Sequence, residues 1–230
     1  MLRVVLKACK TLDELWEYVE RLHSEHFPRY SLAPIFGGGR ITQPKLMCVF
    51  INPTAKNISS RMEWRGPRFP FIGTRQVWRV FHRAGFFDSE LLNEIEASKY
   101  WSLELTNRVL NHLAQRGLYL TNLVKHTGHD ATLPNSRHIK LFLPILIREI
   151  EIVKPEYIVS FGLLPFTTLT GERIKLNEYY SEIMATKRLR FYTLKHARIY
   201  SKVIPCYFPV GRGKPNRAIA ILKLIAALGI

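Results

Sequence analysis

Residues 46–54 read LMCVFINPT, and this stretch decides the fold class. An unbroken apolar run that ends in an Asn-Pro turn is typical of a strand buried on both faces, as in a parallel sheet. The following loop, residues 65–73, reads RGPRFPFIG and mixes basic with aromatic side chains. A buried strand that delivers Asn52 at its tip, beside a ring that can stack, predicts a pocket for a flat polar molecule.

Further apolar runs alternate with helical patterns along the chain. The runs cover about 118–124, 157–161 and 202–208, and the helical patterns cover about 12–27, 75–85, 103–116, 136–153 and 216–229. Ser136 is a plausible cap for the helix over 136–153, and Pro155 a plausible stop. This alternation predicts an α/β protein, a three-layer α/β/α sandwich around a mainly parallel four-stranded sheet. Ligands of such sheets bind beyond the carboxyl ends of the strands.

The 230 residues, of which 47% are apolar, suffice for one ample domain. We expect a single domain over 1–230, with an N-terminal helix and irregular connection over 1–44 and a core over 45–230. The connection contains the triplet Gly37–Gly39, which lacks the strand before it and the helix after it that a phosphate-binding loop needs.

The chain is strongly basic: 34 Lys and Arg against 18 Asp and Glu give a formal charge of +16. Such a charge attracts polyanions, and the interleaving of basic with aromatic residues favours nucleic acid over a membrane surface. No stretch reads as a signal peptide or a membrane span. We expect a monomeric protein of the prokaryotic cytoplasm, associated with the nucleoid. Its three cysteines are expected to be reduced and structural.

Three short motifs resemble those of the uracil-DNA glycosylase superfamily. Ile51–Pro53 with Phe69–Phe71 and Trp78 is similar to the first motif, especially of the mismatch-specific branch. Residues 119–125, YLTNLVK, resemble the base-recognition strand of the thermophilic iron–sulphur branch, although the cluster cysteines are missing. Residues 208–213, FPVGRG, occupy the place of the second motif, where Phe208 replaces the usual His or Asn. The resemblance covers about residues 45–225.

The resemblance implies a monofunctional DNA glycosylase that flips a deaminated base, foremost uracil in a G:U pair, and hydrolyses its N-glycosidic bond without a cofactor. Hypoxanthine, xanthine or mismatched thymine are alternative substrates. Phe208 motivates a second alternative, a DNA-binding protein of this fold with little catalysis. RNA binding through the basic aromatic surface is a third. The implied partner is double-stranded DNA with deaminated or mismatched bases, and single-stranded DNA is a further one.

The same resemblance implies roles for individual residues. Asn52 would orient the attacking water, although an Asx turn before Pro53 is the simpler interpretation. Ile51, Phe71 and Asn122 would bind the base; alternatively, Phe71 fills the core and Asn122 bonds to backbone. The residues expected to contact DNA are Arg65, Arg68, Arg75, Gly211, Arg212, Gly213, Lys214 and Arg217.

His126 and His129 could form a metal pair, because they stand three residues apart after the second predicted strand. No third or fourth ligand stands near them at a helical spacing, so we predict no metal site.

Overall fold

The computed structural model describes residues 6, 8–195, 197, 199–211 and 213–229. Its centre is a six-stranded sheet in the order β1-β3-β2-β4-β6-β5. The strands are β1 (Gly38–Gly39), β2 (Leu46–Phe50), β3 (Leu118–Asn122), β4 (Tyr157–Phe161), β5 (Tyr192–Thr193) and β6 (Lys202–Cys206). The four middle strands are parallel, and the two-residue strands at the edges are antiparallel to their neighbours.

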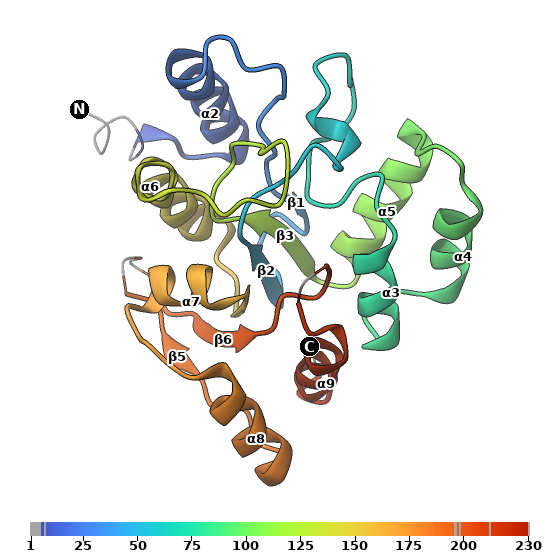
Figure 1. Ribbon diagram of the computed structural model, residues 1–230, viewed down its shortest axis with the longest axis vertical. Coiled ribbons are helices and arrows are strands. Elements are labelled where there is room, and N and C mark those ends of the chain that lie inside the picture. The colour runs from blue at the N-terminus through green and yellow to red at the C-terminus, as the bar shows by residue number, and fades with distance from the viewer. Residues whose placement is uncertain (1–5, 7, 196, 198, 212, 230) are drawn as a thin grey trace.

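Helices cover both faces of this sheet (Figure 1). They are α2 (Leu12–His26), α3 (Gln76–Arg83), α4 (Ser89–Ala97), α5 (Leu103–Gln115), α6 (Ser136–Val153), α7 (Leu163–Thr170), α8 (Leu176–Thr186) and α9 (Pro215–Ala226). Side chains of β2 alternate between two cores: Met47 and Val49 pack with α2, α6 and α7, and Cys48 and Phe50 pack with the other five helices. The predicted three-layer α/β/α sandwich is confirmed.

The predicted sheet was correct for its parallel centre and incomplete at its edges. Each of the four predicted strands is present, and the predicted runs 118–124 and 202–208 end early, at Asn122 and Cys206. The edge strands β1 and β5 were not predicted, because a pair of residues is too short to show alternation. Among the described helices, α4, α7 and α8 were also not predicted.

The Gly37–Gly39 triplet serves close packing. A Cβ atom on Gly37 would lie 2.1 Å from the hydroxyl of Tyr119, and Gly39 has a φ of +118°, which favours glycine. Gly38 and Gly39 form β1, which pairs with β3. The glycines thus let the N-terminal connection approach the sheet closely, a role that the sequence did not predict.

The three cysteines, Cys9, Cys48 and Cys206, are buried, and none of them forms a disulfide within the described part of the chain. None of the helices in the described part of the chain is long and apolar enough to cross a membrane.

Candidate active site at the carboxyl edge of the sheet

The carboxyl ends of the parallel strands bring residues 51–53 beside the segment that follows β3. Phe50, the last residue of β2, is the register partner of Asn122, the last residue of β3. The segments that follow these two strands continue side by side, because the amide of Val124 donates to the carbonyl of Ile51 over 3.0 Å. Asn52 and Asn122 therefore lie at the same edge of the sheet, on adjacent strands. In Figure 1 the segments that follow β2 and β3 converge in the middle of the face shown.

Asn52 is half-buried and is held in a local turn. Its Nδ2 donates to the carbonyl of Pro53 over 3.3 Å, and that carbonyl also accepts from the amide of Gly128 over 2.9 Å. A Cβ atom on Gly128 would lie 3.4 Å from Asn52 Nδ2, an ordinary contact distance, so the amide lies close to the Gly128 backbone. With the nitrogen engaged, the amide oxygen is the atom that can accept a hydrogen bond from a water.

Phe71 is held in an unfavourable backbone conformation. Its φ is +71°, in the left-handed region that a bulky residue rarely adopts. The Phe71 carbonyl accepts hydrogen bonds from Thr74 Oγ1 at 2.9 Å and from Trp78 Nε1 at 3.3 Å. Its half-buried ring meets Phe50 edge to face, with 4.6 Å between the ring centres. The surrounding structure therefore fixes an aromatic ring over the end of β2.

Asn122 carries the clearest sign of an incomplete site. Its side chain is 2% exposed, and its Nδ2 is buried without a hydrogen-bond partner among the described residues. Such an orphaned donor costs about 1–3 kcal/mol, so buried polar groups are nearly always paired. Asn122 shares the face of the sheet with Phe50, whose ring contacts Phe71. The unpaired amide and the fixed ring therefore belong to one site.

The second motif reaches the same place from β6. The ring of Phe208 lies 6.4 Å from that of Phe50 and perpendicular to it. A Cβ atom on Gly213 would lie 1.9 Å from the carbonyl of Phe208, so this tight loop requires a glycine there. Gly211 is exposed with a φ of +61°. Arg212, expected to contact DNA, lies outside the described residues.

The family model of the uracil DNA glycosylase superfamily matches residues 36–222. The chain belongs to this superfamily. The match spans the whole sheet and the three segments described above, and members of the superfamily generally act as DNA glycosylases. A search of curated proteins found no match.

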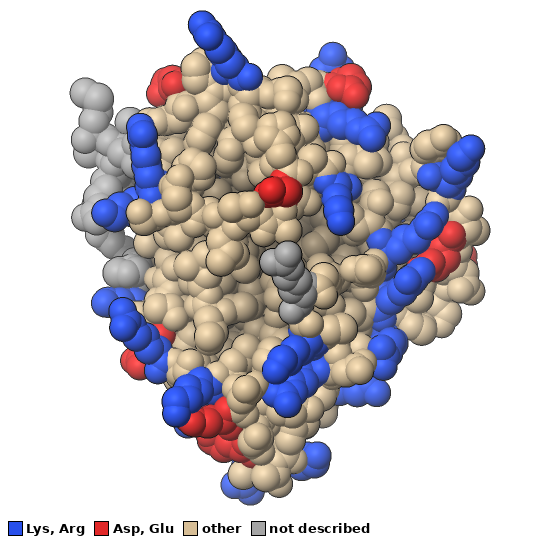
Figure 2. Space-filling view, viewed as in Figure 1, with Lys and Arg blue, Asp and Glu red and all other residues tan. Residues whose placement is uncertain are grey.

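DNA is the partner on which proteins of the uracil DNA glycosylase fold act, and the surface of this chain suits a polyanion. Figure 2 shows Lys and Arg side chains distributed around the face that carries the site, with fewer Asp and Glu among them. Such a surface draws DNA in without reading its sequence.

The predicted DNA-contacting residues fall into two groups. Arg65 and Lys214 are exposed. Arg68, in contrast, donates to the carbonyls of Ser59, Arg61 and Trp64. Arg75 donates to the carbonyls of Ile95 and Ser98, and Arg217 to Asn177 Oδ1 and the Tyr207 hydroxyl. The side chains of the second group bond to other parts of the protein, although Arg75 is also exposed, and contact with DNA remains a prediction for both groups.

The predicted histidine pair is split between the interior and the surface. His126 is buried, stacks on Phe27 at 3.9 Å and lies 3.1 Å from His23 through Nδ1 and Nε2, whereas His129 is exposed. Burial lowers the pKa of both His23 and His126 to about 4, so both are neutral at pH 7. No group of three or more His, Cys, Asp or Glu residues in the described ranges is arranged to hold a metal.

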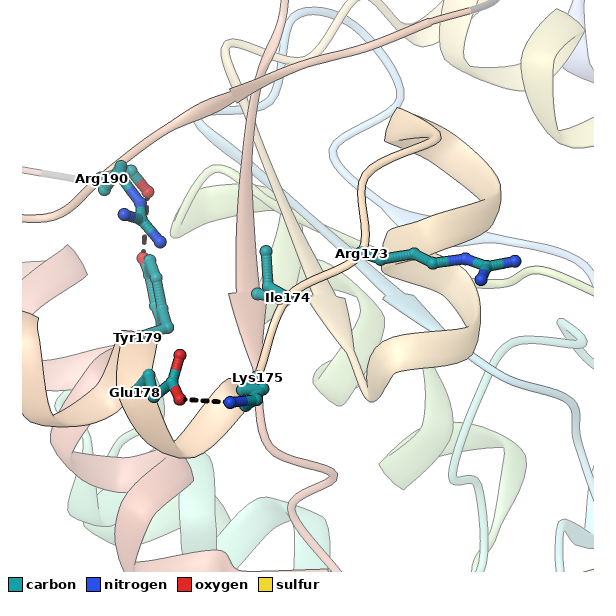
Figure 3. Close-up of a pocket in the computed structure, with 6 residues that line it drawn as sticks. All are labelled: Arg173, Ile174, Lys175, Glu178, Tyr179 and Arg190. Carbon is teal, nitrogen blue, oxygen red and sulfur yellow. Dashed lines mark hydrogen bonds and ion pairs between the residues drawn. The ribbon is translucent and has the colours of Figure 1, made fainter.

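Two hollows on the surface are lined by neither Asn52, Phe71 nor Asn122. One, of about 470 Å³, is lined by Arg173, Ile174, Lys175, Glu178, Tyr179 and Arg190. Figure 3 shows two pairs among these residues: Lys175 with Glu178 at 2.8 Å, and the Tyr179 hydroxyl with the Arg190 carbonyl at 3.1 Å. The other, of about 450 Å³, is lined by Gly73, Arg75, Gln76, Arg79, Ser98, Lys99 and Trp101. Arg75 is the one predicted site residue among them.

The sequence did not predict the residues that support the loops of the site. The connection before β2 links two of its loops, because Ile35 N donates to the Lys125 carbonyl and Phe36 N to the Arg68 carbonyl, both over 3.0 Å. Lys125 and Glu149 form an ion pair of which neither side chain is exposed. A lysine after a strand carries no sequence signal of burial, since lysine is almost always exposed.

Proposed function

We propose that this protein is a monofunctional DNA glycosylase that flips uracil, foremost from G:U pairs, out of double-stranded DNA and hydrolyses its N-glycosidic bond. It acts as a monomer and needs no metal or organic cofactor. The observation that carries the proposal is the buried, unpaired amide of Asn122 beside the fixed ring of Phe71. Binding of a base edge would supply the missing hydrogen bond, and the ring would stack on the base.

The amide of Asn122 suits the edge of uracil. Uracil presents a carbonyl oxygen next to an N–H group, and a side-chain amide offers a donor next to an acceptor. Cytosine presents an amine and an unprotonated nitrogen at these positions, so an amide fixed in one orientation would meet donor with donor. A site built to make such bonds rejects the wrong partner strongly, because its buried polar groups are then left unpaired.

Asn52 would act on the water. Its amide oxygen would accept a hydrogen bond and hold the water against the anomeric carbon of the flipped nucleotide, while the bond to the base breaks and the base leaves as an anion. An amide is a poor general base compared with a carboxylate, so the reaction depends on positioning and is slower than one in which an aspartate takes the proton.

Duplexes that contain uracil, hypoxanthine, xanthine or mismatched thymine test the proposal under single-turnover conditions. We expect abasic sites mainly from uracil opposite guanine, and strand breaks only after alkali. Breaks without alkali would contradict monofunctional chemistry. If hypoxanthine or xanthine reacts fastest, the substrate assignment is wrong.

The variant Asn52→Ala tests whether Asn52 acts on the water. We expect its turnover to fall about 100-fold or more, because general-base and positioning effects of one side chain have this size, with little change in the Kd for the duplex. Equal losses of turnover and binding would indicate that Asn52 only closes the turn before Pro53.

Phe208 favours one rival function, a DNA-binding protein of this fold with little catalysis. Its ring packs near Phe50 at a place where the superfamily usually has a polar side chain. We expect Phe208→Asn to raise the rate of uracil excision several-fold, because an amide there could bond to the departing base. A wild-type protein that binds duplex tightly but yields no abasic site from any deaminated base would establish the rival.

A further inference from the structure

Lys125 and Glu149 form a fully satisfied polar network in the interior. Lys125 Nζ uses its three donors on Glu149 Oε2 at 2.5 Å, on the Asn122 carbonyl at 2.9 Å and on Thr121 Oγ1. The other oxygen of Glu149 accepts from the Tyr119 hydroxyl at 2.9 Å. Burial raises the pKa of Tyr119, so its hydroxyl stays protonated and donates.

A buried ion pair is weak evidence of a contribution to stability. Two charges with no exposed surface lose their hydration, and well-packed apolar residues of similar volume often replace a buried ion pair without loss of stability. What the pair does provide is a fixed position for its partners. Lys125 folds back on the end of β3 and bonds to the backbone of Asn122, three residues before it.

The backbone of Asn122 is consequently fixed on both sides of its carbonyl group. The carbonyl oxygen accepts from Lys125, and the next amide, that of Leu123, donates to the Phe50 carbonyl over 2.8 Å. The side chain of Asn122 points to the opposite face of the sheet from Tyr119 and Thr121, since successive residues of a strand alternate. The ion pair and the unpaired amide thus occupy opposite faces of the same strand end.

We propose that the Lys125–Glu149 pair is a positioning device that sets the direction of the Asn122 amide and thereby the discrimination between uracil and cytosine. This inference rests on the proposed function, because it assigns a specificity role within that same site. Neither residue touches the base: Lys125 acts through the backbone of Asn122, and Glu149 holds Lys125.

The double variant Lys125→Met with Glu149→Leu tests the role, because it removes both charges together and leaves neither unpaired. We expect a cooperative thermal transition, an unchanged Kd for duplex DNA, and a preference for uracil over cytosine that falls at least about 10-fold. A preference equal to that of the wild type would overturn the proposal.

The matched control is Ile150→Ala, which creates a cavity on α6 beside Glu149. Both variants are assayed at the same interval below their own Tm. If Ile150→Ala loses as much preference as the double variant, the pair is merely structural and the proposal fails. If the double variant does not fold, Tyr119→Phe is tested instead, because it removes the hydroxyl that donates to Glu149. An approximately 3-fold loss of the preference for uracil supports the role, and no loss refutes it.

A readout without catalysis separates this proposal from the proposed function. The side-chain amide signal of Asn122 in a ¹⁵N-labelled sample, assigned by its disappearance in Asn122→Leu, should shift or broaden in the double variant but not in Ile150→Ala. An unchanged signal would refute positioning even if the enzyme is active. A wild-type protein that excises no base would refute the proposed function, while the signal still reports on the pair.

Discussion

At the scale of single residues, the site contains two features that are individually unfavourable. Phe71 has a left-handed backbone, and the amide nitrogen of Asn122 is buried without a partner. Each feature costs on the order of 1–3 kcal/mol, so the surrounding structure must hold them in place. A bound base would repay the cost at Asn122.

Trp78→Phe tests how Phe71 is held. The variant keeps an aromatic ring in the core but removes the indole N–H that donates to the Phe71 carbonyl. We expect the free energy of unfolding to fall by about 1 kcal/mol, the ordinary contribution of one hydrogen bond, and uracil excision to fall several-fold because the stacking ring is less restrained. Chemical denaturation and single-turnover kinetics measure the two effects.

Phe81→Leu is a suitable control for Trp78→Phe, since it also perturbs α3 in the buried core without touching the Phe71 carbonyl. If it lowers excision as much at equal stability, the hydrogen bond has no specific role.

At the scale of elements, apolar runs predicted all four parallel strands, because strands buried on both faces show as unbroken hydrophobic stretches. The helix α7 escaped prediction for the same reason: its residues, LLPFTTLT, lack a polar stripe and include β-branched threonines. The nine-residue helix α4 is also short, although Asp88 caps it through a 2.9 Å bond to the amide of Leu91.

The start of α6 shows how a boundary can be misplaced by one residue. Ser136 was the predicted cap, but the structure assigns the cap to Asn135, whose Oδ1 accepts from the amide of His138 at 2.9 Å. Both residue types are good caps, so composition alone cannot choose between neighbours.

Alanine substitution distinguishes the two caps. Asn135→Ala should lower the free energy of unfolding by about 1 kcal/mol, the usual cost of losing a cap, whereas Ser136→Ala should change it by less than about 0.5 kcal/mol. Urea denaturation measures both. The reverse order would show that Ser136 is the cap in solution.

Much of the candidate site followed from the sequence because its residues stand at strand ends, where a parallel sheet must bring them together. The positions of Asn52 and Asn122 were predictable on that ground, whereas Phe71, in the loop between β2 and α3, was singled out by the family resemblance. The buried residues that hold these side chains in place could not be predicted. The ion pair of Lys125 with Glu149 joins residues 24 positions apart, and no local pattern encodes such a pairing.

At the scale of the whole molecule, the layer formed by α2 and α6 carries the second buried polar group, the histidine pair. His23 lies on α2, and His126 follows β3. His138 of α6 lies 5.2 Å from His126 between ring centres. Protonation of His23 or His126 would place a positive charge between α2, α6 and the segment after β3.

Stability should therefore depend on pH. The pKa of His23 and of His126 is about 4 in the folded protein and near 6.5 when unfolded, so the unfolded chain binds more protons between these values. The stability that these rings contribute is fully present above pH 6.5 and falls as the pH decreases towards 4, by on the order of 3 kcal/mol for each ring. Thermal melting across this range measures the loss.

His126→Gln should flatten the pH profile, because it removes one of the two titrating rings. A wild-type Tm that stays constant from pH 7 to pH 4 would contradict the role of the cluster.

The absence of a side chain at Gly37 has a bearing on how base preference could be engineered. A single methyl group there would press on both the Tyr119 hydroxyl, at 2.1 Å, and Glu149 Oε1, at 2.5 Å. A mutagenesis library restricted to groups that contact the nucleobase would omit this position. The codon for Gly37 belongs in such a library, because a side chain there would press from outside the pocket on the network that we propose positions Asn122.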